Sequence, residues 1–257
     1  MTKVGILGAS GRMGQMLIKN IQEENTLTLT SIFAKEPATN IPNSCTQYDN
    51  MQDFLSSCDG VIDFSLPDAT EEMLNKLLDS NMQKFLVIGT TGFTPHQQNL
   101  LKQVSHNMPI LYASNMSLGV AMLNKVVSLV SAKLKDFDCE IVEQHHKHKK
   151  DAPSGTALTL AHTAANAREL DLDKVRVSGR DGHIGARTED EIGVLAVRGG
   201  DIVGRHTVGF YNDGEFLELN HTATSRETFS KGAVSAFKWL SGVKQSGLYN
   251  INDFLGL

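Results

Sequence analysis

The stretch KVGILGASGRMG, residues 3–14, decides the fold because Gly8, Gly11 and Gly14 lie where a strand-like run passes into a helical pattern. Lys3–Leu7 is rich in strand-forming residues, and Arg12–Glu24 carries apolar residues at helical spacing. Glycine at such a turn lets the backbone approach a pyrophosphate, and the first N–H groups of the helix attract its negative charge. The stretch therefore predicts a dinucleotide-binding unit, and the alternative is a tight turn with no ligand.

Strand-like and helix-like segments alternate through the first half of the chain. Short continuous apolar runs are typical of strands covered on both faces, and two helical segments have proline in the first turn. The predicted strands are Lys3–Leu7, Leu27–Ala34, Val61–Phe64, Phe85–Ile88 and Pro109–Ala113, and the predicted helices are Arg12–Glu24, Pro67–Ser80 and Pro95–Asn107. This order predicts an α/β fold with a Rossmann-type, doubly wound parallel sheet.

A different pattern begins after Asn115. The predicted helices are Leu118–Leu134 and Ser154–Leu170, and the predicted strands are Asp138–Glu143, Ile192–Val197, Asp201–Phe210 and Glu215–Ala223. Gly199-Gly200 and Asn212-Asp213-Gly214 are typical of hairpin turns, so the last three strands are expected to form an antiparallel meander within a mixed sheet. The helical tail Thr228–Leu240 is expected to pack back on the first domain.

Composition is that of an ordinary globular protein and argues against several partners. The 257 residues are 40% hydrophobic and 21% charged, and the net charge of −5 gives no bulk attraction to nucleic acid or to an anionic membrane. No apolar run approaches the roughly 20 residues that span a bilayer, and the N-terminus lacks the apolar stretch of a secretory signal. The three cysteines have no metal-ligand spacing, which indicates reduced thiols in a cytoplasmic protein.

Segments that follow predicted strands are candidates for the dinucleotide site, because ligands of open α/β sheets bind at the carboxyl ends of strands. Lys35 suits a 2′-phosphate and Glu36 suits a ribose hydroxyl, so NADPH is favoured and NADH stays open. Two later loops are expected on the nicotinamide side, unless they are ordinary loops. The candidate cofactor-binding residues are Gly8, Ala9, Ser10, Gly11, Arg12, Met13, Lys35, Gly89, Thr90, Thr91, Ala113, Ser114, Asn115 and Met116.

The run EQHHKHKKD, residues 143–151, gathers three His and three Lys within six residues. A solvated surface is one interpretation. A metal site is a second, but no carboxylate or cysteine is spaced to complete a tetrahedral set with the histidines, so no metal is predicted. The third is a site for anion binding and proton transfer, because His titrates near neutrality and crowding by other cations lowers the pKa of a lysine.

The segment after this run favours the third interpretation. Ser154-Gly155-Thr156 opens a predicted helix, with Ser154 as its cap and the backbone N–H groups of the next two residues at the helix start. Such a helix start is suited to a carboxylate. A cationic run beside it predicts a small dicarboxylate substrate, and the alternative is that Ser154 and Thr156 only cap the helix.

Together these segments resemble the 4-hydroxy-tetrahydrodipicolinate reductase family, also called dihydrodipicolinate reductases, of bacterial lysine and diaminopimelate biosynthesis. The resemblance covers nearly the whole chain and is most specific in EQHHKHKKDAPSGTAL, residues 143–158. It also includes GASGRMG (8–14), VIDFSLP (61–67), VIGTTGF (87–93), ASNMSLGV (113–120), VRGGDIVGRHTVGF (197–210) and SRETFSKGAVSAFKWL (225–240).

The resemblance implies an NAD(P)H-dependent oxidoreductase that reduces 4-hydroxy-tetrahydrodipicolinate to tetrahydrodipicolinate with loss of water. It implies a dinucleotide-binding domain over residues 1–116 and 226–257, completed by the C-terminal tail. It also implies an inserted α+β domain over residues 117–225 that binds the substrate and builds a homotetramer.

The family's functional residues carry over by position. His145 and Lys149 match its proton-transfer residues, and His146, Gly155 and Thr156 match its contacts to the substrate carboxylates. The loop from Gly8 to Met13 matches its dinucleotide loop, and Gly89, Thr90, Thr91 and Ala113 through Met116 match its nicotinamide side.

Some positions depart from the family pattern. Ala34 and Lys35 stand where members often have an acidic residue followed by Arg, which bears on cofactor preference. Lys147 stands where many members have Arg, and Met116 stands where many have Phe. Two other interpretations compete. Another Rossmann-fold dehydrogenase of amino-acid metabolism would lack the His/Lys run joined to Ser-Gly-Thr, and a non-catalytic dinucleotide sensor would need a DNA-binding segment that the sequence does not contain.

Overall fold

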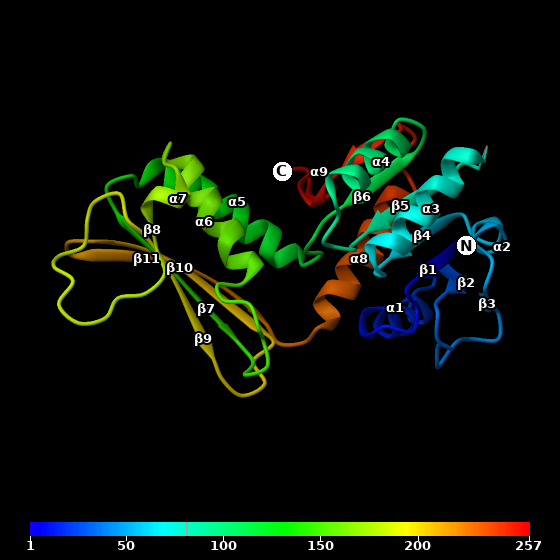
Figure 1. The fold of residues 1–257 in the computed structure, drawn as a ribbon, viewed down its shortest axis with the longest axis horizontal. Helices are drawn as coiled ribbons and strands as arrows, with labels where there is room; N and C mark the ends of the chain where they lie inside the picture. The colour runs from blue at the N-terminus through cyan, green and yellow to red at the C-terminus, as the bar shows by residue number, and fades with distance from the viewer. Residues whose placement is uncertain (81) are drawn as a thin grey trace. The chain divides into compact units, whose positions relative to one another are not determined.

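The computed structural model, which describes residues 1–80 and 82–257, separates into two units that the chain connects twice (Figure 1). Unit 1 comprises Met1–Ser117 and Glu227–Leu257, and unit 2 comprises Leu118–Arg226. The chain therefore leaves unit 1 after its sixth strand and returns to it for the last long helix.

Unit 1 is built on a seven-stranded sheet with the order β12-β6-β5-β4-β1-β2-β3. Its strands are β1 (Thr2–Leu7), β2 (Leu27–Phe33), β3 (Thr46–Tyr48), β4 (Gly60–Asp63), β5 (Phe85–Ile88), β6 (Pro109–Tyr112) and β12 (Gly247–Tyr249). Every neighbouring pair is parallel, which confirms the predicted doubly wound sheet. The strand order reverses between β1 and β4, and in such sheets the ligand crevice opens at that point.

Helices cover both faces of this sheet. One layer contains α1 (Arg12–Gln22) and α8 (Glu227–Leu240), and the other contains α2 (Met51–Ser56), α3 (Pro67–Asp79) and α4 (Pro95–Ser105). Ala233 and Phe237 of α8 are fully buried, and α8 packs against α1 and strands β4, β5 and β6, so the C-terminal tail completes the domain as predicted. A short helix, α9 (Ile251–Leu255), ends the chain.

Unit 2 has a five-stranded mixed sheet with helices over one face (Figure 1). Its strands are β7 (Asp138–His145), β8 (Arg176–Val177), β9 (Ile192–Arg198), β10 (Gly204–Asn212) and β11 (Glu215–Ala223), and its helices are α5 (Leu118–Lys133), α6 (Gly155–Ala167) and α7 (Leu172–Val175). Val127 of α5 and Leu160 of α6 pack in one buried cluster with Ile141, Val194 and Val208 of the sheet.

The predicted antiparallel meander is wrong at one point. The sheet order is β11-β10-β7-β9-β8, so β7 lies between β9 and β10 and pairs in parallel with β9. Gly199-Gly200 is therefore no hairpin turn, and the Gly199 N–H donates to the His145 carbonyl at 2.9 Å. The physical reason is that β7 carries buried residues at alternate positions and fits the centre of the sheet, which adjacency in sequence does not reveal. The predicted hairpin turn at Asn212-Asp213-Gly214 is confirmed, because Asn212 pairs with Glu215 across it.

Several boundaries and several short elements differ from the sequence prediction. The predicted strand Asp201–Phe210, for example, runs from Gly204 to Asn212. The predicted strand ending at Glu143 continues to His145, which places that ring on the sheet. The predicted helix Ser154–Leu170 ends at Ala167. The pattern did not predict β3, α2, α7, β8, β12 and α9, which are all six residues or shorter.

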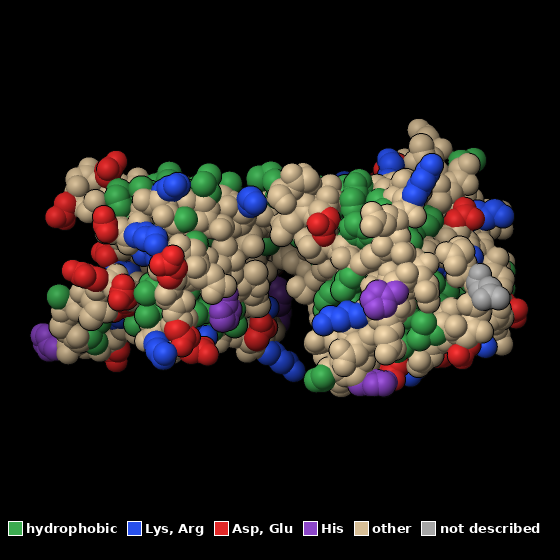
Figure 2. Space-filling model, turned by 90° about the horizontal axis from the view of Figure 1, so that it is seen from above, with side chains coloured by type: hydrophobic (Ala, Val, Ile, Leu, Met, Phe, Trp, Pro, Cys, Tyr) green, Lys and Arg blue, Asp and Glu red, His purple; other side chains and the backbone are tan. Residues whose placement is uncertain are grey.

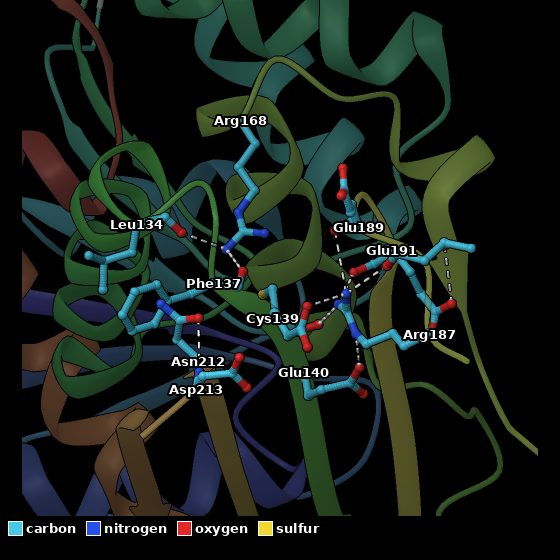
Figure 3. A network of polar contacts seen from close by, with 12 residues as sticks. Leu134, Phe137, Cys139, Glu140, Arg168, Arg187, Glu189, Glu191, Asn212 and Asp213 are labelled. Atoms are coloured by element: carbon cyan, nitrogen blue, oxygen red, sulfur yellow. Dashed lines mark hydrogen bonds and ion pairs between the residues drawn. The ribbon is translucent and has the colours of Figure 1, made fainter. Parts of the chain in front are cut away.

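Arginine contacts hold the loop of residues 178–191 against the start of β7. Figure 3 shows Arg187 beside Glu140, to which it donates at 3.1 Å, and Arg187 also donates to Asp138 at 2.7 Å. Arg180 donates to both carboxylate oxygens of Glu140, at 2.7 and 3.1 Å. Ion pairs thus fix the first residues of β7, at the end of the strand opposite to His145.

The distribution of charge on the surface and the polarity of the helices agree with the ordinary composition of the chain. On the face drawn in Figure 2, acidic and basic side chains are interspersed over both units. In the part of the chain that the structure describes, no helix combines the length and apolarity that crossing a membrane requires.

Gly232 provides a test of how closely α8 packs in unit 1. A methyl group at this position would overlap the carbonyl oxygen of Met116. Gly232→Ala is expected to lower the free energy of unfolding by about 1–2 kcal/mol, because the overlap outweighs the roughly 1 kcal/mol that alanine contributes in a helix. Urea unfolding measures the change. Gly242→Ala, whose added methyl would lie 3.5 Å from the nearest atom, is the control, and equal stability of the two variants would contradict the packing.

Candidate active site

The glycine loop after β1 is folded tightly over the start of α1. Gly8 has a φ of +87°, and a methyl there would lie 2.6 Å from the Phe64 carbonyl oxygen. A methyl at Gly14 would overlap the carbonyl oxygen of Gly8, so the first turn of α1 lies directly against the loop. Gly11 caps α1 without any side-chain hydrogen bond. The amides at this helix start are therefore not covered by a capping side chain, as an anion site requires.

A cavity of about 450 Å³ opens beside this loop, at the ends of β1, β2 and β4. Its lining consists of Leu7, Gly8, Ser10, Gly11, Phe33, Ala34, Lys35, Phe64, Ser65, Leu66, Asp68, Ala69 and Glu72. Four predicted cofactor residues thus come together here: Gly8, Ser10, Gly11 and Lys35. The other predicted cofactor residues are outside this lining, as far as the described residues show.

Asp63 connects this cavity to the loop after β5. The Asp63 carboxylate is fully buried and accepts hydrogen bonds from the Ser65 N–H and hydroxyl at 2.9 and 2.6 Å. It also accepts from the hydroxyls of Thr70 at 2.5 Å and Thr90 at 3.0 Å. Burial raises the pKa of Asp63, and these hydrogen bonds oppose that rise. The predicted cofactor residue Thr90 is thereby held in one position.

The remaining predicted nicotinamide-side residues differ in exposure. Thr91 and Ser114 are exposed. A methyl at Gly89 would overlap the Phe64 ring, so the loop after β5 passes close to that side chain. Met116 is 1% exposed and packs in the core cluster that includes α8. Its side chain is therefore turned into unit 1.

In unit 2, the polar run begins with a buried carboxylate at the end of β7. Glu143 is 0% exposed and accepts two hydrogen bonds from Arg198, at 2.7 and 2.9 Å. It also accepts from His145 Nδ1 at 2.6 Å and from the Ser154 N–H at 3.0 Å. Burial alone would raise the pKa of Glu143, but the bonds from Arg198, His145 and Ser154 outweigh it and lower that pKa.

The start of α6 is built around Ser154. The Ser154 hydroxyl accepts from the Ala157 N–H at 3.2 Å, which is the predicted N-cap, and lies 3.2 Å from His206 Nε2. His206 is 4% exposed, and burial lowers its pKa to about 4. The His206 and His145 rings meet edge to face at 5.3 Å. At neutral pH His206 is therefore a neutral neighbour of both the helix start and His145.

Lys149 and His146 follow β7 on the same turn, where the Lys149 N–H donates to the His146 carbonyl at 3.1 Å. The Lys149 ammonium lies 2.9 Å from Asp151 and is the main cause of a lowered pKa at that carboxylate. The environment of Lys149 thus contains an anion, Asp151, in addition to the neighbouring cations. Burial, followed by the charge of Arg226, lowers the pKa of His146.

The structure brings the predicted residues of unit 2 into one region. His145, His146 and Lys149 lie at the end of β7, and Glu143 joins that end to Ser154, immediately before Gly155 and Thr156. Sequence reasoning gave no role to Glu143, Arg198 and His206. A signal for Glu143 was present, because its place in a strand with alternating buried residues puts a charge on the buried face. Across the described residues, no group of three His, Cys, Asp or Glu side chains is arranged to hold a metal.

Two family models together match almost the entire chain. The model described as "Dihydrodipicolinate reductase, N-terminus" matches residues 2–116, and the one described as "Dihydrodipicolinate reductase, C-terminus" matches residues 119–255. The junction between them lies close to the junction between the two units.

Relatives and a solved structure agree with these models. The chain is 63% identical over 258 residues to 4-hydroxy-tetrahydrodipicolinate reductase of Sulfurovum sp. (strain NBC37-1), covering 100% of both chains. It is 62% identical to the protein of that name in Sulfurimonas denitrificans, covering 99% of both. In fold it is similar to a dipicolinate-bound dihydrodipicolinate reductase from Paenisporosarcina sp. TG-14, with 24% identity, a TM-score of 0.80 and 97% of each chain covered. The chain therefore belongs to the dihydrodipicolinate reductase family.

Proposed function

We propose that this protein reduces 4-hydroxy-tetrahydrodipicolinate to tetrahydrodipicolinate, with loss of water, in diaminopimelate and lysine biosynthesis. The observation that supports this most is the full-length identity of 63% to a reductase of that name. The polar region of unit 2 has the chemistry that a doubly charged ring needs, because cationic side chains lie beside a capped helix start.

Unit 1 is proposed to bind the dinucleotide cofactor. The glycine loop supports a fit, because methyl groups at Gly8 and Gly14 would fill the space that the backbone needs for its tight turn. When bound, a reduced nicotinamide dinucleotide supplies the hydride that the substrate receives. The loop from Gly8 to Met13 would hold the pyrophosphate, and Lys35 in the cavity lining favours a 2′-phosphate, so we propose NADPH as the preferred cofactor with NADH also accepted.

Unit 2 is proposed to bind the substrate and move its proton. His146 and the helix start at Gly155 and Thr156 would bind the two ring carboxylates. As C4 of the ring gains a hydride, C3 must gain a proton, and in this proposal Lys149 donates it while His145 stabilises or relays the charge. The ion pair with Asp151 would direct the Lys149 ammonium before transfer.

A homotetramer is proposed from exposed apolar side chains on the sheet of unit 2, and a cytoplasmic location from the state of the cysteines. Strands β9 and β11 leave Val197, Phe216 and Leu217 between 40% and 67% exposed, which suits the sheet packing of a homotetramer. The cysteines are free thiols and all three are buried, which suits the reducing cytoplasm.

A coupled assay tests the function together with the role of Lys149. The synthase that makes the substrate is combined with this protein, and the absorbance of NADH or NADPH is followed in parallel. Wild-type protein is expected to oxidise both cofactors, and Lys149→Ala to lower kcat by about 10²–10⁴-fold, the contribution of a positioned proton donor.

Lys150→Ala is the matched control, because it removes the same charge from the same run and Lys150 is exposed. Its kcat is expected within about three-fold of wild type, since a screened surface charge contributes little. An inactive wild-type protein would overturn the function. An active wild type with equal kcat in Lys149→Ala would overturn only the role of Lys149.

Thr156→Val tests the carboxylate site. The hydroxyl would bind the same carboxylate before and during the reaction, so its loss is expected to raise KM by about 10- to 100-fold with little change in kcat. Steady-state kinetics with varied substrate measures both constants. Thr163→Val, two turns further along α6, is the control, since the Thr163 hydroxyl donates to Asn124 at 2.8 Å. A KM for Thr156→Val equal to that of the control argues against this carboxylate contact.

A further inference from the structure

The proposed function assigns no role to Glu143, the buried carboxylate at the centre of the polar region. Its two oxygens have separate partners. Oε1 accepts from the Ser154 N–H and from Arg198 Nη2, and Oε2 accepts from His145 Nδ1 and from Arg198 Nη1. One carboxylate therefore joins the predicted proton-transfer ring, the start of α6 and the end of β9.

The geometry of β7 explains why these groups meet. Alternate residues of a strand point to the same face, so Glu143 and His145 are neighbours on the buried side of the sheet. His145 pairs with Arg198 across the parallel β7–β9 ladder, which brings the guanidinium to the same carboxylate. The Arg198 fork matches both carboxylate oxygens, the geometry in which such pairs are strongest.

The charge of Glu143 fixes the protonation of the ring. An ionised carboxylate only accepts hydrogen bonds, so His145 Nδ1 must carry a proton to make its 2.6 Å contact. In a neutral imidazole the other nitrogen, Nε2, is then the acceptor. Among the described residues Nε2 has no hydrogen-bond partner, and it lies beside Gly204, where a methyl would come within 3.1 Å.

We propose that Glu143 is a positioning residue that holds His145 in the tautomer protonated on Nδ1, so that Nε2 is the nitrogen that stabilises or relays the charge when Lys149 donates its proton. The contact with the Ser154 N–H gives Glu143 a second task, because the same carboxylate sets the helix start relative to that ring. The tautomer assignment stands on the contacts alone, whereas its effect on turnover rests on the proposed function.

Glu143→Gln tests the proposal because the amide has one acceptor and one donor. If the Gln oxygen keeps the Ser154 N–H and Arg198 Nη2, its NH₂ group occupies the place of Oε2 and donates towards His145 Nδ1. The ring must then accept at Nδ1 and carry its proton on Nε2, which is the opposite tautomer. In serine proteases the equivalent exchange lowers kcat by about 10⁴-fold.

Two measurements are made on the full-length variant. NMR of protein labelled with ¹⁵N-histidine reads the protonation of each ring nitrogen, with the His145 signals assigned by their loss in His145→Gln. The expected result is a protonated Nδ1 in wild type and a protonated Nε2 in Glu143→Gln. In the coupled assay, kcat of Glu143→Gln is expected to fall by about 100-fold or more, while KM for the dinucleotide stays within about two-fold.

Glu140→Gln is the matched control, because Glu140 lies on the same strand and also pairs with arginine, but at the opposite end (Figure 3). It is expected to leave the His145 tautomer unchanged and kcat within about three-fold of wild type. If Glu143→Gln does not fold, the double variant Glu143→Met/Arg198→Met replaces the ion pair by apolar side chains, an exchange that is often neutral for stability because it leaves neither charge buried alone. Its His145 is expected to lose the fixed Nδ1 proton and its kcat to fall similarly.

The outcomes separate the inference from the proposed function. A wild-type Nε2–H tautomer, or an unchanged tautomer in the variants that lack the carboxylate, overturns the inference whether or not the protein is active. An exchanged tautomer with unchanged kcat overturns the role of Nε2 in the reaction. Inactive wild-type protein with the expected NMR result overturns the function and leaves the positioning of His145 in place.

Discussion

The free-energy cost of burying a carboxylate is the constraint on which the arrangement at the end of β7 and the start of α6 depends. Glu143 is fully covered, and an unpaired charge at such a place would be strongly unfavourable. Arg198, His145 and the Ser154 amide together satisfy both of its oxygens. Each of these donors comes from a different part of the chain, so one electrostatic requirement brings the strand end, the neighbouring strand and the helix start into register.

Unit 1 meets the same constraint in a different way. Asp63 is equally buried at the end of β4, but its partners are hydroxyls and an amide instead of a cation. The pKa of Asp63 is accordingly raised by burial, whereas the pKa of Glu143 is lowered by its hydrogen bonds, above all those from the Arg198 guanidinium. Both carboxylates stand at a strand end and orient a residue predicted for function, Thr90 in one unit and His145 in the other.

The sequence was informative where function is encoded in contiguous residues. The glycine loop at residues 8–14 and the run at 143–156 both carry their chemistry within one short contiguous segment, and their strand and helix contexts were predicted within a few residues. The partners of Glu143 were beyond this reasoning, since Arg198 is 55 residues away and meets it only because β7 and β9 pair in parallel. The predicted meander failed for the same reason, because strand order depends on packing between distant segments.

The position of β7 also explains how a side chain at a strand end is held without a rigid loop. Its start is fixed by Glu140 and the arginines of the loop 178–191, and its middle by the apolar packing of Ile141. Gln144 pairs with neighbours on both sides, and His145 pairs with Arg198 of β9. Because the backbone of His145 is held by the sheet, one hydrogen bond to Glu143 is enough to determine the orientation of its ring. A loop residue such as Lys149 has no such support, and it depends on its ion pair with Asp151.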